Sequence, residues 1–249
     1  MLTSRLPLRH TLRDRLGGVL AALAASAGCC VCGLVLTFVL APRQGLQAAS
    51  VARLPNMGPA EVAAAAPGDT LLISGVLAGN APLLAGSDLV AYRIDEWQVT
   101  VTGGEDGGES KPFGRWQSHA TTTPELVLET EGQPLQLLAS SHVRLSGPLH
   151  EALVASDSAL VADDAGEPRA DGTLRYHGLA NGDPVTVLGE KASSGGILPE
   201  RLFLGDRTAF EASEQQAASN FLISGLASLA LAPVVLIGGV LAAILWRRR

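Results

Sequence analysis

The chain has 249 residues, 47% of them hydrophobic, and its 18 basic and 24 acidic residues give a net charge of −6. This length allows one domain with a hydrophobic core in addition to membrane segments. The acidic balance argues against nucleic acid as a partner, because a phosphate backbone is held mainly by Lys and Arg.

Two apolar runs without a charged residue, Leu16–Ala41 and Phe221–Trp246, lie near the two ends of the chain. A helix of this length reaches ~39 Å, which exceeds the ~30 Å hydrocarbon core of a bilayer. We therefore expect residues 16–41 and 221–246 to be transmembrane helices, with the lipid bilayer as a partner.

Arginines cluster just outside both apolar runs. Residues 1–15 contain four arginines and one acid, Asp14, and residues 247–249 are all arginine. Basic residues next to a span stay on the cytoplasmic side. We expect a multi-pass protein of the cell membrane, with cytoplasmic tails at 1–15 and 247–249 and with residues 42–219 extracytoplasmic. Those central residues include 11 basic and 23 acidic side chains, a net charge of −12.

The first apolar run has two alternative interpretations. A cleaved signal peptide has an apolar stretch of ~7–15 residues, which is shorter than this run. A lipoprotein signal needs a cysteine after a short motif of small residues, and Ser26-Ala27-Gly28-Cys29 matches that pattern loosely. We favour an uncleaved span over both.

The three cysteines, Cys29, Cys30 and Cys32, all lie in the first apolar run. We expect them to be small packing or lipid-facing residues, with acylation or a redox role as alternatives. Residues 42–219 contain no cysteine, so this region has no disulfide and no thiolate metal site. It must be held together by its core.

The pattern of the central region predicts a mainly β domain, a small barrel or sandwich, at residues 68–211. Residues 42–67 are expected to be a linker with a short helix near Pro59–Ala66, and residues 212–220 a juxtamembrane helix continuous with the second span. Short apolar or alternating segments predict strands. They are Thr70–Leu77, Leu89–Thr102, Arg115–Thr122, Glu125–Thr130, Leu135–Ala139, Thr173–His177, Pro184–Gly189 and Leu202–Phe210.

The segment Leu89–Thr102 has the clearest strand pattern. Its alternation of apolar residues changes parity near Asp95-Glu96, which predicts a β-bulge there. Arg93, Asp95 and Glu96 beside Trp97 form a compact polar cluster. A structural ion pair and a binding site both account for such a cluster.

Candidate catalytic and metal-binding residues are sparse. The histidines at 119, 142, 150 and 177 lack the spacing of a metal site and are expected on a polar surface. The acids at 105, 106, 109, 163 and 164 lack the alternating spacing of a calcium loop. Trp97 and Trp116 are expected in the core or at the domain rim. We assign no catalytic, cofactor-binding or metal-binding residue, and expect no cofactor.

A series of short motifs follows in a fixed order along the central region. They are Gly68-Asp69-Thr70, Gly75-Val76, Pro82-Leu83, Val90-Ala91-Tyr92-Arg93, Trp116, Pro124 to Gly132, Gly182 to Gly189 and Leu202 to Ser213. This order, with an apolar run on each side, resembles the GIDE, or beside-a-membrane, domain over residues 59–246. The segment from Pro124 lacks the aromatic residue of that family. The domain is found in mitochondrial membrane-anchored RING-type ubiquitin ligases and in many prokaryotic proteins.

The resemblance implies a β domain that contacts substrates or partners. It does not carry ligase activity to this chain, because a RING needs eight Cys or His zinc ligands and the three cysteines lie in the first apolar run. We therefore expect a prokaryotic-type member without the RING.

The sequence favours a non-catalytic module that binds a ligand or another membrane or envelope protein. An envelope hydrolase using a serine, His119, His142 or an aspartate is the alternative. A third hypothesis is a scaffold whose two spans organise neighbouring membrane proteins.

Overall fold

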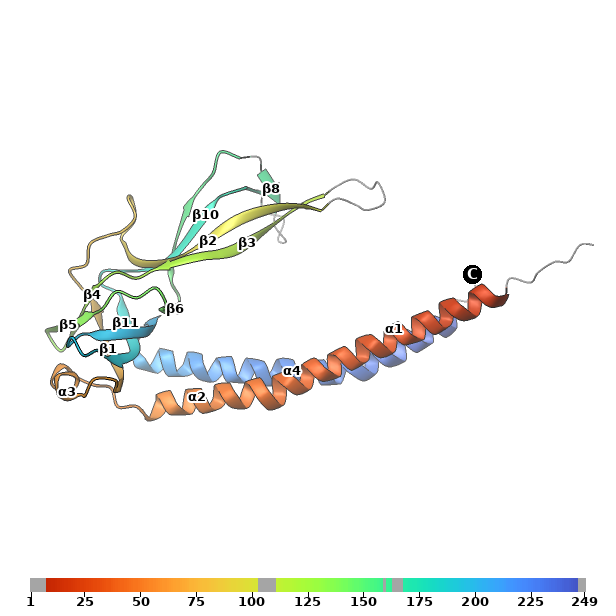
Figure 1. The fold of residues 1–249 in the computed structure, drawn as a ribbon, viewed down its shortest axis with the longest axis horizontal. Helices are drawn as coiled ribbons and strands as arrows, with labels where there is room; N and C mark the ends of the chain where they lie inside the picture. The colour runs from red at the N-terminus through yellow and green to blue at the C-terminus, as the bar shows by residue number, and fades with distance from the viewer. Residues whose placement is uncertain (1–7, 103–110, 159, 163–167, 246–249) are drawn as a thin grey trace, which may run out of the picture. The chain divides into compact units, whose positions relative to one another are not determined.

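The computed structural model describes residues 8–102, 111–158, 160–162 and 168–245 (Figure 1). The chain divides into two compact units. The helical unit comprises Met1–Ala52 and Glu211–Arg249, and the β unit comprises Arg53–Phe210.

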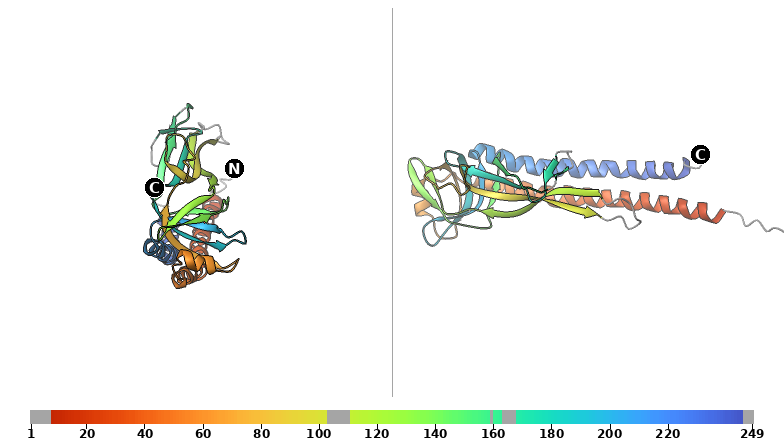
Figure 2. Two further views of the ribbon diagram at one scale, coloured as in Figure 1. Left: turned by 90° about the vertical axis from the view of Figure 1, so that its left-hand side faces the viewer. Right: turned by 90° about the horizontal axis from the view of Figure 1, so that it is seen from above.

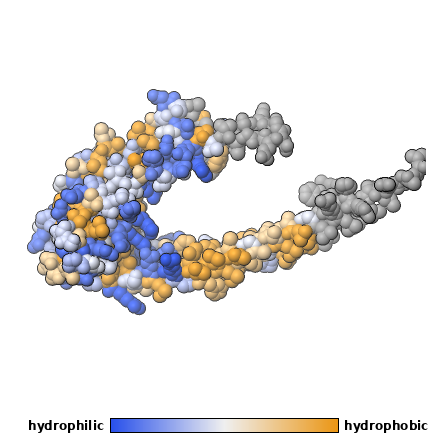
Figure 3. All heavy atoms as spheres, viewed as in Figure 1, coloured by the Kyte–Doolittle hydropathy of each residue, from blue (hydrophilic) through white to orange (hydrophobic). Residues whose placement is uncertain are grey.

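Long helices stand at both ends of the described chain. The first is α1 (Leu8–Val35), followed by the π-helical turn η1 (Leu36–Leu40) and by α2 (Ala41–Arg53); the last is α4 (Arg207–Leu245). Two stretches, Gly17–Arg53 and Arg207–Ala242, are long and apolar enough to cross a membrane. Figure 3 shows hydrophobic residues along these helices. The prediction of two apolar helices flanking a β-rich region is confirmed.

Helices α1 and α4 lie side by side and antiparallel (Figures 1 and 2). The Ser26 hydroxyl on α1 donates a hydrogen bond of 2.9 Å to the Ala232 carbonyl on α4. A Cβ atom on Gly33 would lie 2.7 Å from Leu229 Cγ, so only glycine lets the helices approach this closely. Further close approaches join Thr37 to Gly225 and Ala22 to Gly239.

The first helical segment is longer than the sequence indicated. Residues 42–53, expected to be part of a linker, continue the helix as α2, with Ala41, Ala48 and Val51 buried on one face. The short helix is confirmed as α3 (Pro59–Ala64), where the Gly58 N–H donates to Glu61 Oε2 at 2.9 Å. Residues 212–220 are helical and continuous with the rest of α4, as predicted.

A five-stranded barrel forms the core of the β unit. The strands neighbour one another in the order β11-β1-β4-β5-β12, and β12 pairs with β11 to close the ring. Their bounds are β1 Thr70–Leu77, β4 Leu126–Thr130, β5 Gln133–Leu137, β11 Pro184–Lys191 and β12 Ile197–Leu204. The inward faces bury a continuous apolar cluster that includes Leu71, Ile73, Leu128 and Val187. Closure of the ring leaves no open sheet edge among these five strands.

A two-residue turn connects β4 and β5. Thr130 pairs with Gln133, so Glu131 and Gly132 are the two loop residues, with φ angles of 53° and 75°. Positive φ at both positions is the two-residue turn that matches strand twist, and glycine adopts it without strain.

A second, four-stranded antiparallel sheet has the order β3-β2-β10-β7. Its bounds are β2 Leu89–Thr102, β3 Lys111–Thr122, β7 His150–Val154 and β10 Leu174–Ala180. Val90, Ala91 and Leu179 belong to the apolar core, whereas the middles of β2 and β10 carry polar residues. The pairing of β2 with β3 slips between Ile94 and Asp95, which confirms the predicted bulge.

The sequence placed one strand incorrectly and missed several others. Residues 202–210 were expected to be a strand, but β12 ends at Leu204 and α4 begins at Arg207. Asp206 caps this helix by accepting a hydrogen bond of 2.8 Å from the Ala209 N–H. The strands not predicted are short or lie at a sheet edge; they are β6 (Arg144–Ser146), β7, β8 (Leu160–Ala162) and β9 (Pro168–Ala170).

Candidate functional site

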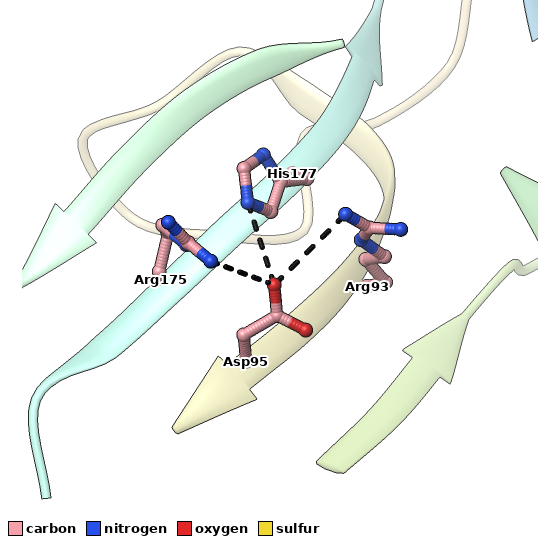
Figure 4. A network of polar contacts seen from close by, with 4 residues as sticks. All are labelled: Arg93, Asp95, Arg175 and His177. Carbon is pink, nitrogen blue, oxygen red and sulfur yellow. Dashed lines mark hydrogen bonds and ion pairs between the residues drawn. The ribbon is translucent and has the colours of Figure 1, made fainter. Parts of the chain in front are cut away.

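A polar cluster lies on one face of the four-stranded sheet, on the neighbouring strands β2 and β10 (Figure 4). Arg175 pairs directly with Asp95, and His177 pairs directly with Arg93. Residues opposite one another in an antiparallel pair project from the same face, and so do residues two apart on one strand. The register therefore gathers all four side chains, which we call the β2–β10 cluster.

Asp95 is buried at the centre of this cluster. Its Oδ2 atom lies 3.4 Å from Arg175 Nη2, 3.4 Å from His177 Nε2 and 4.0 Å from Arg93 Nη2. Ionised carboxylates are buried only where neighbouring charges compensate them, and here the two guanidinium groups do so. All three contacts are longer than the ~2.7–2.9 Å of a tight charge-assisted hydrogen bond. The cluster is thus charge-compensated but loosely joined.

The surroundings of His177 favour its neutral form. Burial is the main cause that lowers the pKa of this imidazole below 6.5, and the positive charges of Arg175 and Arg93 lower it further. Asp95 and Glu151 act in the opposite direction. The fixed charges of the β2–β10 cluster at neutral pH are therefore two guanidinium groups and one carboxylate.

Three N–H groups in and beside the cluster are buried without a hydrogen-bond partner: Arg93 Nε, Arg175 Nε and Trp97 Nε1. The buried His177 Nε2 atom, a donor or an acceptor depending on the tautomer, is unpartnered as well. His177 Nε2 lies near Asp95 Oδ2 without the alignment that a hydrogen bond requires. An unpaired buried donor costs about 1–3 kcal/mol, so native proteins normally supply an acceptor.

Two tryptophan side chains, Trp97 and Trp116, lie beside Arg175. Trp97 and Trp116 pair directly across β2 and β3, with ring centroids 5.4 Å apart at 66°. The Arg175 guanidinium lies 4.1 Å from the Trp116 ring centroid, a favourable cation–π contact. The Trp97 indole covers Gly114, where a Cβ atom would overlap the ring. Arg175 is thus fixed from two sides, by Asp95 and by Trp116.

The structure unites only part of the polar cluster that the sequence suggested. Arg93 and Asp95 face each other, but Glu96 belongs to the opposite face and lies 3.9 Å from His119. Arg175 and His177, 80 or more residues further along the chain, complete the cluster and were missed. The spacing of these two polar residues, at alternate positions of an otherwise apolar strand, was the available signal.

The other histidines have separate neighbours. His150 on β7 contacts the Asp183 carboxylate at 2.9 and 3.1 Å, while His119 and His142 are exposed. The expectation of a surface position was wrong for His177, whose side chain is only 15% exposed. Within the described part of the chain, no group of three or more His, Cys, Asp or Glu side chains is placed to hold a metal ion. The acids at 105, 106, 109, 163 and 164 lie outside the described residues.

Comparisons with protein-family models, curated proteins and solved structures find no match to this chain. The resemblance to the GIDE domain therefore stays a prediction that rests on the motifs quoted above. Function has to be inferred from the geometry of the chain itself.

Proposed function

We propose that this chain is a two-span membrane protein that presents its β unit outside the cytoplasm as a module for binding a ligand or another protein. The GIDE-like character of that domain is part of the proposal. The observation that carries it is the exposure of apolar side chains along α1 and α4, combined with a polar cluster inside the β unit.

The exposed side chains of the helical unit require an apolar solvent. Phe38 is 67% exposed and Ile223 is 64% exposed, and both lie in helices rich in Leu and Val. A soluble protein rarely exposes so large an apolar surface, since burying one such side chain gains about 1.5–3 kcal/mol. Lipid supplies that burial without any further protein.

The distribution of arginines supports the orientation. Residues 1–15 and 247–249 carry seven of the 18 basic residues, while residues 42–219 carry 23 of the 24 acids. Retention of Lys and Arg on the cytoplasmic side then leaves the β unit on the other side. Disulfide-free domains are stable there when their core is sufficient, and the closed barrel provides such a core.

The binding role rests on the β2–β10 cluster. Its loose ion contacts and its unpartnered N–H groups lower stability compared with a purely apolar interior. Recognition of a polar ligand is the function that such an arrangement supports best. The hydrolase alternative has no comparable support, because His119 and His142 are exposed on separate segments.

Alkaline carbonate extraction and cysteine labelling together test the proposal. Cys29, Cys30 and Cys32 are replaced by alanine, and a single cysteine is introduced as Ser193→Cys, an exposed position of the β unit, or as Ser4→Cys in the N-terminal tail. We expect the chain to stay in the membrane pellet. A membrane-impermeant maleimide should label the first variant in intact spheroplasts and the second only after permeabilisation.

Two results contradict the proposal in different ways. Release of the intact chain by carbonate excludes transmembrane helices. Labelling of Ser4→Cys but not of Ser193→Cys in intact spheroplasts reverses the orientation and places the β unit in the cytoplasm.

A further inference from the structure

We propose that the β2–β10 cluster is a phosphate-binding site, with Arg93, Arg175 and His177 as the groups that contact the phosphate oxygens. The inference rests on the proposed function, because it names the class of ligand that the module recognises. The phosphate is either a free ion or ester, or the headgroup of a lipid.

The unpartnered groups determine that the ligand is a hydrogen-bond acceptor. Arginine Nε and tryptophan Nε1 atoms only donate hydrogen bonds, and both kinds are unpartnered here. A cation or a neutral donor would leave them unpaired. An anion with several oxygens can accept from more than one of them at the same time.

The fixed charges favour an anion as well. Two guanidinium groups oppose the single buried carboxylate of Asp95. Glu151 on β7 lies opposite His177 in the sheet. Its side chain is exposed, so solvent screens its negative charge. Two planar guanidinium groups beside an imidazole suit a tetrahedral phosphate better than a carboxylate, which has only two oxygens.

Access to the site is through Arg93. Its side chain is 42% exposed and its contact with Asp95 is 4.0 Å long, so moving it costs little. Arg175 is held by Trp116 and Asp95 and stays in place. The Nε atoms of Arg93 and Arg175 are buried. Phosphate binding therefore requires the Arg93 side chain to rotate outward first and then to close over the ligand.

The surroundings make a local site easy to distinguish from general charge attraction. Residues 42–219 carry a net charge of −12, which repels anions at long range. Phosphate affinity in this domain therefore has to come from specific contacts.

Tryptophan fluorescence of the full chain in a non-ionic detergent provides the test. Trp97 and Trp116 adjoin the cluster, so binding should change their emission. The protein is titrated with inorganic phosphate at constant ionic strength, with chloride as the reference. We expect a saturable change for the wild type, and a rise in Kd of about tenfold or more for Arg93→Gln and Arg175→Gln.

The matched control is Arg144→Gln, which removes one exposed positive charge elsewhere in the β unit. It should change Kd by less than about twofold, as expected for a distant surface charge. The proposal is overturned if the wild type gives no saturable response, or if Arg144→Gln weakens binding as much as Arg93→Gln. Should Arg175→Gln fail to fold, Arg93→Gln decides alone, because Arg93 is half-exposed and makes no tight contact.

Nanodiscs distinguish the two sources of phosphate. If phosphatidic acid in the bilayer raises the apparent Kd for inorganic phosphate above its value in phosphatidylcholine, a lipid headgroup occupies the site. An unchanged Kd indicates a soluble phosphate ligand. Loss of phosphate binding with intact carbonate resistance overturns this inference alone, whereas carbonate release with intact phosphate binding overturns the membrane assignment alone.

Discussion

The helical unit and the β unit use apolar residues in opposite ways. In the β unit, large apolar side chains of the barrel core, such as Leu71 and Leu128, are fully buried. In the helical unit the large side chains point outward, and the contact between helices is made by Gly33, Gly225 and other small residues. Water drives the first arrangement. In the bilayer that we propose for the helices, lipid is as apolar as leucine, so close backbone packing would drive the second.

The distribution of polar groups also differs between the two units. The helical unit has isolated polar groups: the Ser26 hydroxyl bonds to the Ala232 carbonyl, and the Thr37 hydroxyl is buried without a hydrogen-bond partner. The β unit concentrates them in the β2–β10 cluster and leaves several donors unpartnered. The first arrangement holds two helices together, and the second is suited to a ligand.

The largest expected effect is at the barrel core. Leu71→Ala removes a fully buried side chain and should lower the free energy of unfolding by about 2–5 kcal/mol. Leu226→Ala, on the exposed face of α4, is the control and should cost less than about 1 kcal/mol. Chemical denaturation of the full chain in detergent measures both. Equal losses for the two leucines would remove the contrast between the units.

A smaller effect is expected at the contact between the two long helices. Gly225→Ala adds a Cβ atom that overlaps the Thr37 side chain, and should destabilise the helix pair by about 1–3 kcal/mol. Gly238→Ala lies on the same helix with no atom near its Cβ, and should be neutral or slightly stabilising. Unfolding in sodium dodecyl sulfate compares the two variants. If both behave alike, the helices do not pack through Gly225.

The interhelical hydrogen bond should contribute less. Ser26→Ala removes the donor to the Ala232 carbonyl and should cost about 0.6 kcal/mol, the usual size of such bonds in membrane proteins. Ser228→Ala removes a hydroxyl that bonds within its own helix and serves as the control. The same detergent unfolding assay applies, and a loss at Ser228 that exceeds the loss at Ser26 would contradict the assigned contact.

The last expected effect is confined to acidic pH. Since the pKa of His177 is lowered in the folded state, the unfolded chain takes up a proton first as the pH falls below 6.5. The native state therefore loses stability through this window, and the loss levels off below the folded pKa. His177→Gln should remove that part of the acid sensitivity and leave stability near pH 8 almost unchanged.

Stability measured from pH 8 to pH 5 checks this prediction. The exposed His142→Gln variant is the control and should retain the wild-type pH profile. A His177→Gln profile that coincides with the wild type would show that burial does not perturb this imidazole.

Much of the fold follows from local sequence signals. The strand predicted at Thr70–Leu77 coincides with β1, and Leu89–Thr102 coincides with β2, because turn residues bound both segments. The bulge near Asp95 followed from a change of parity within one strand. The continuation of the helix from 42 to 53 was missed because Pro42 and Gly45 are typical of a linker, although the segment is amphipathic. This helix is stabilised by burial of Ala48 and Val51.

The sequence by itself determined the two apolar helices, the acidic character of the region between them and half of the polar cluster. Those features depend on residues that are adjacent in the chain. Only the tertiary structure decided that Arg175 and His177 join Arg93 and Asp95, since the pairing register of β2 and β10 is set by the whole sheet. In the same way, only helix packing selected Gly33 and Gly225 as contact points among the many small residues of α1 and α4, because a close approach depends on which faces meet.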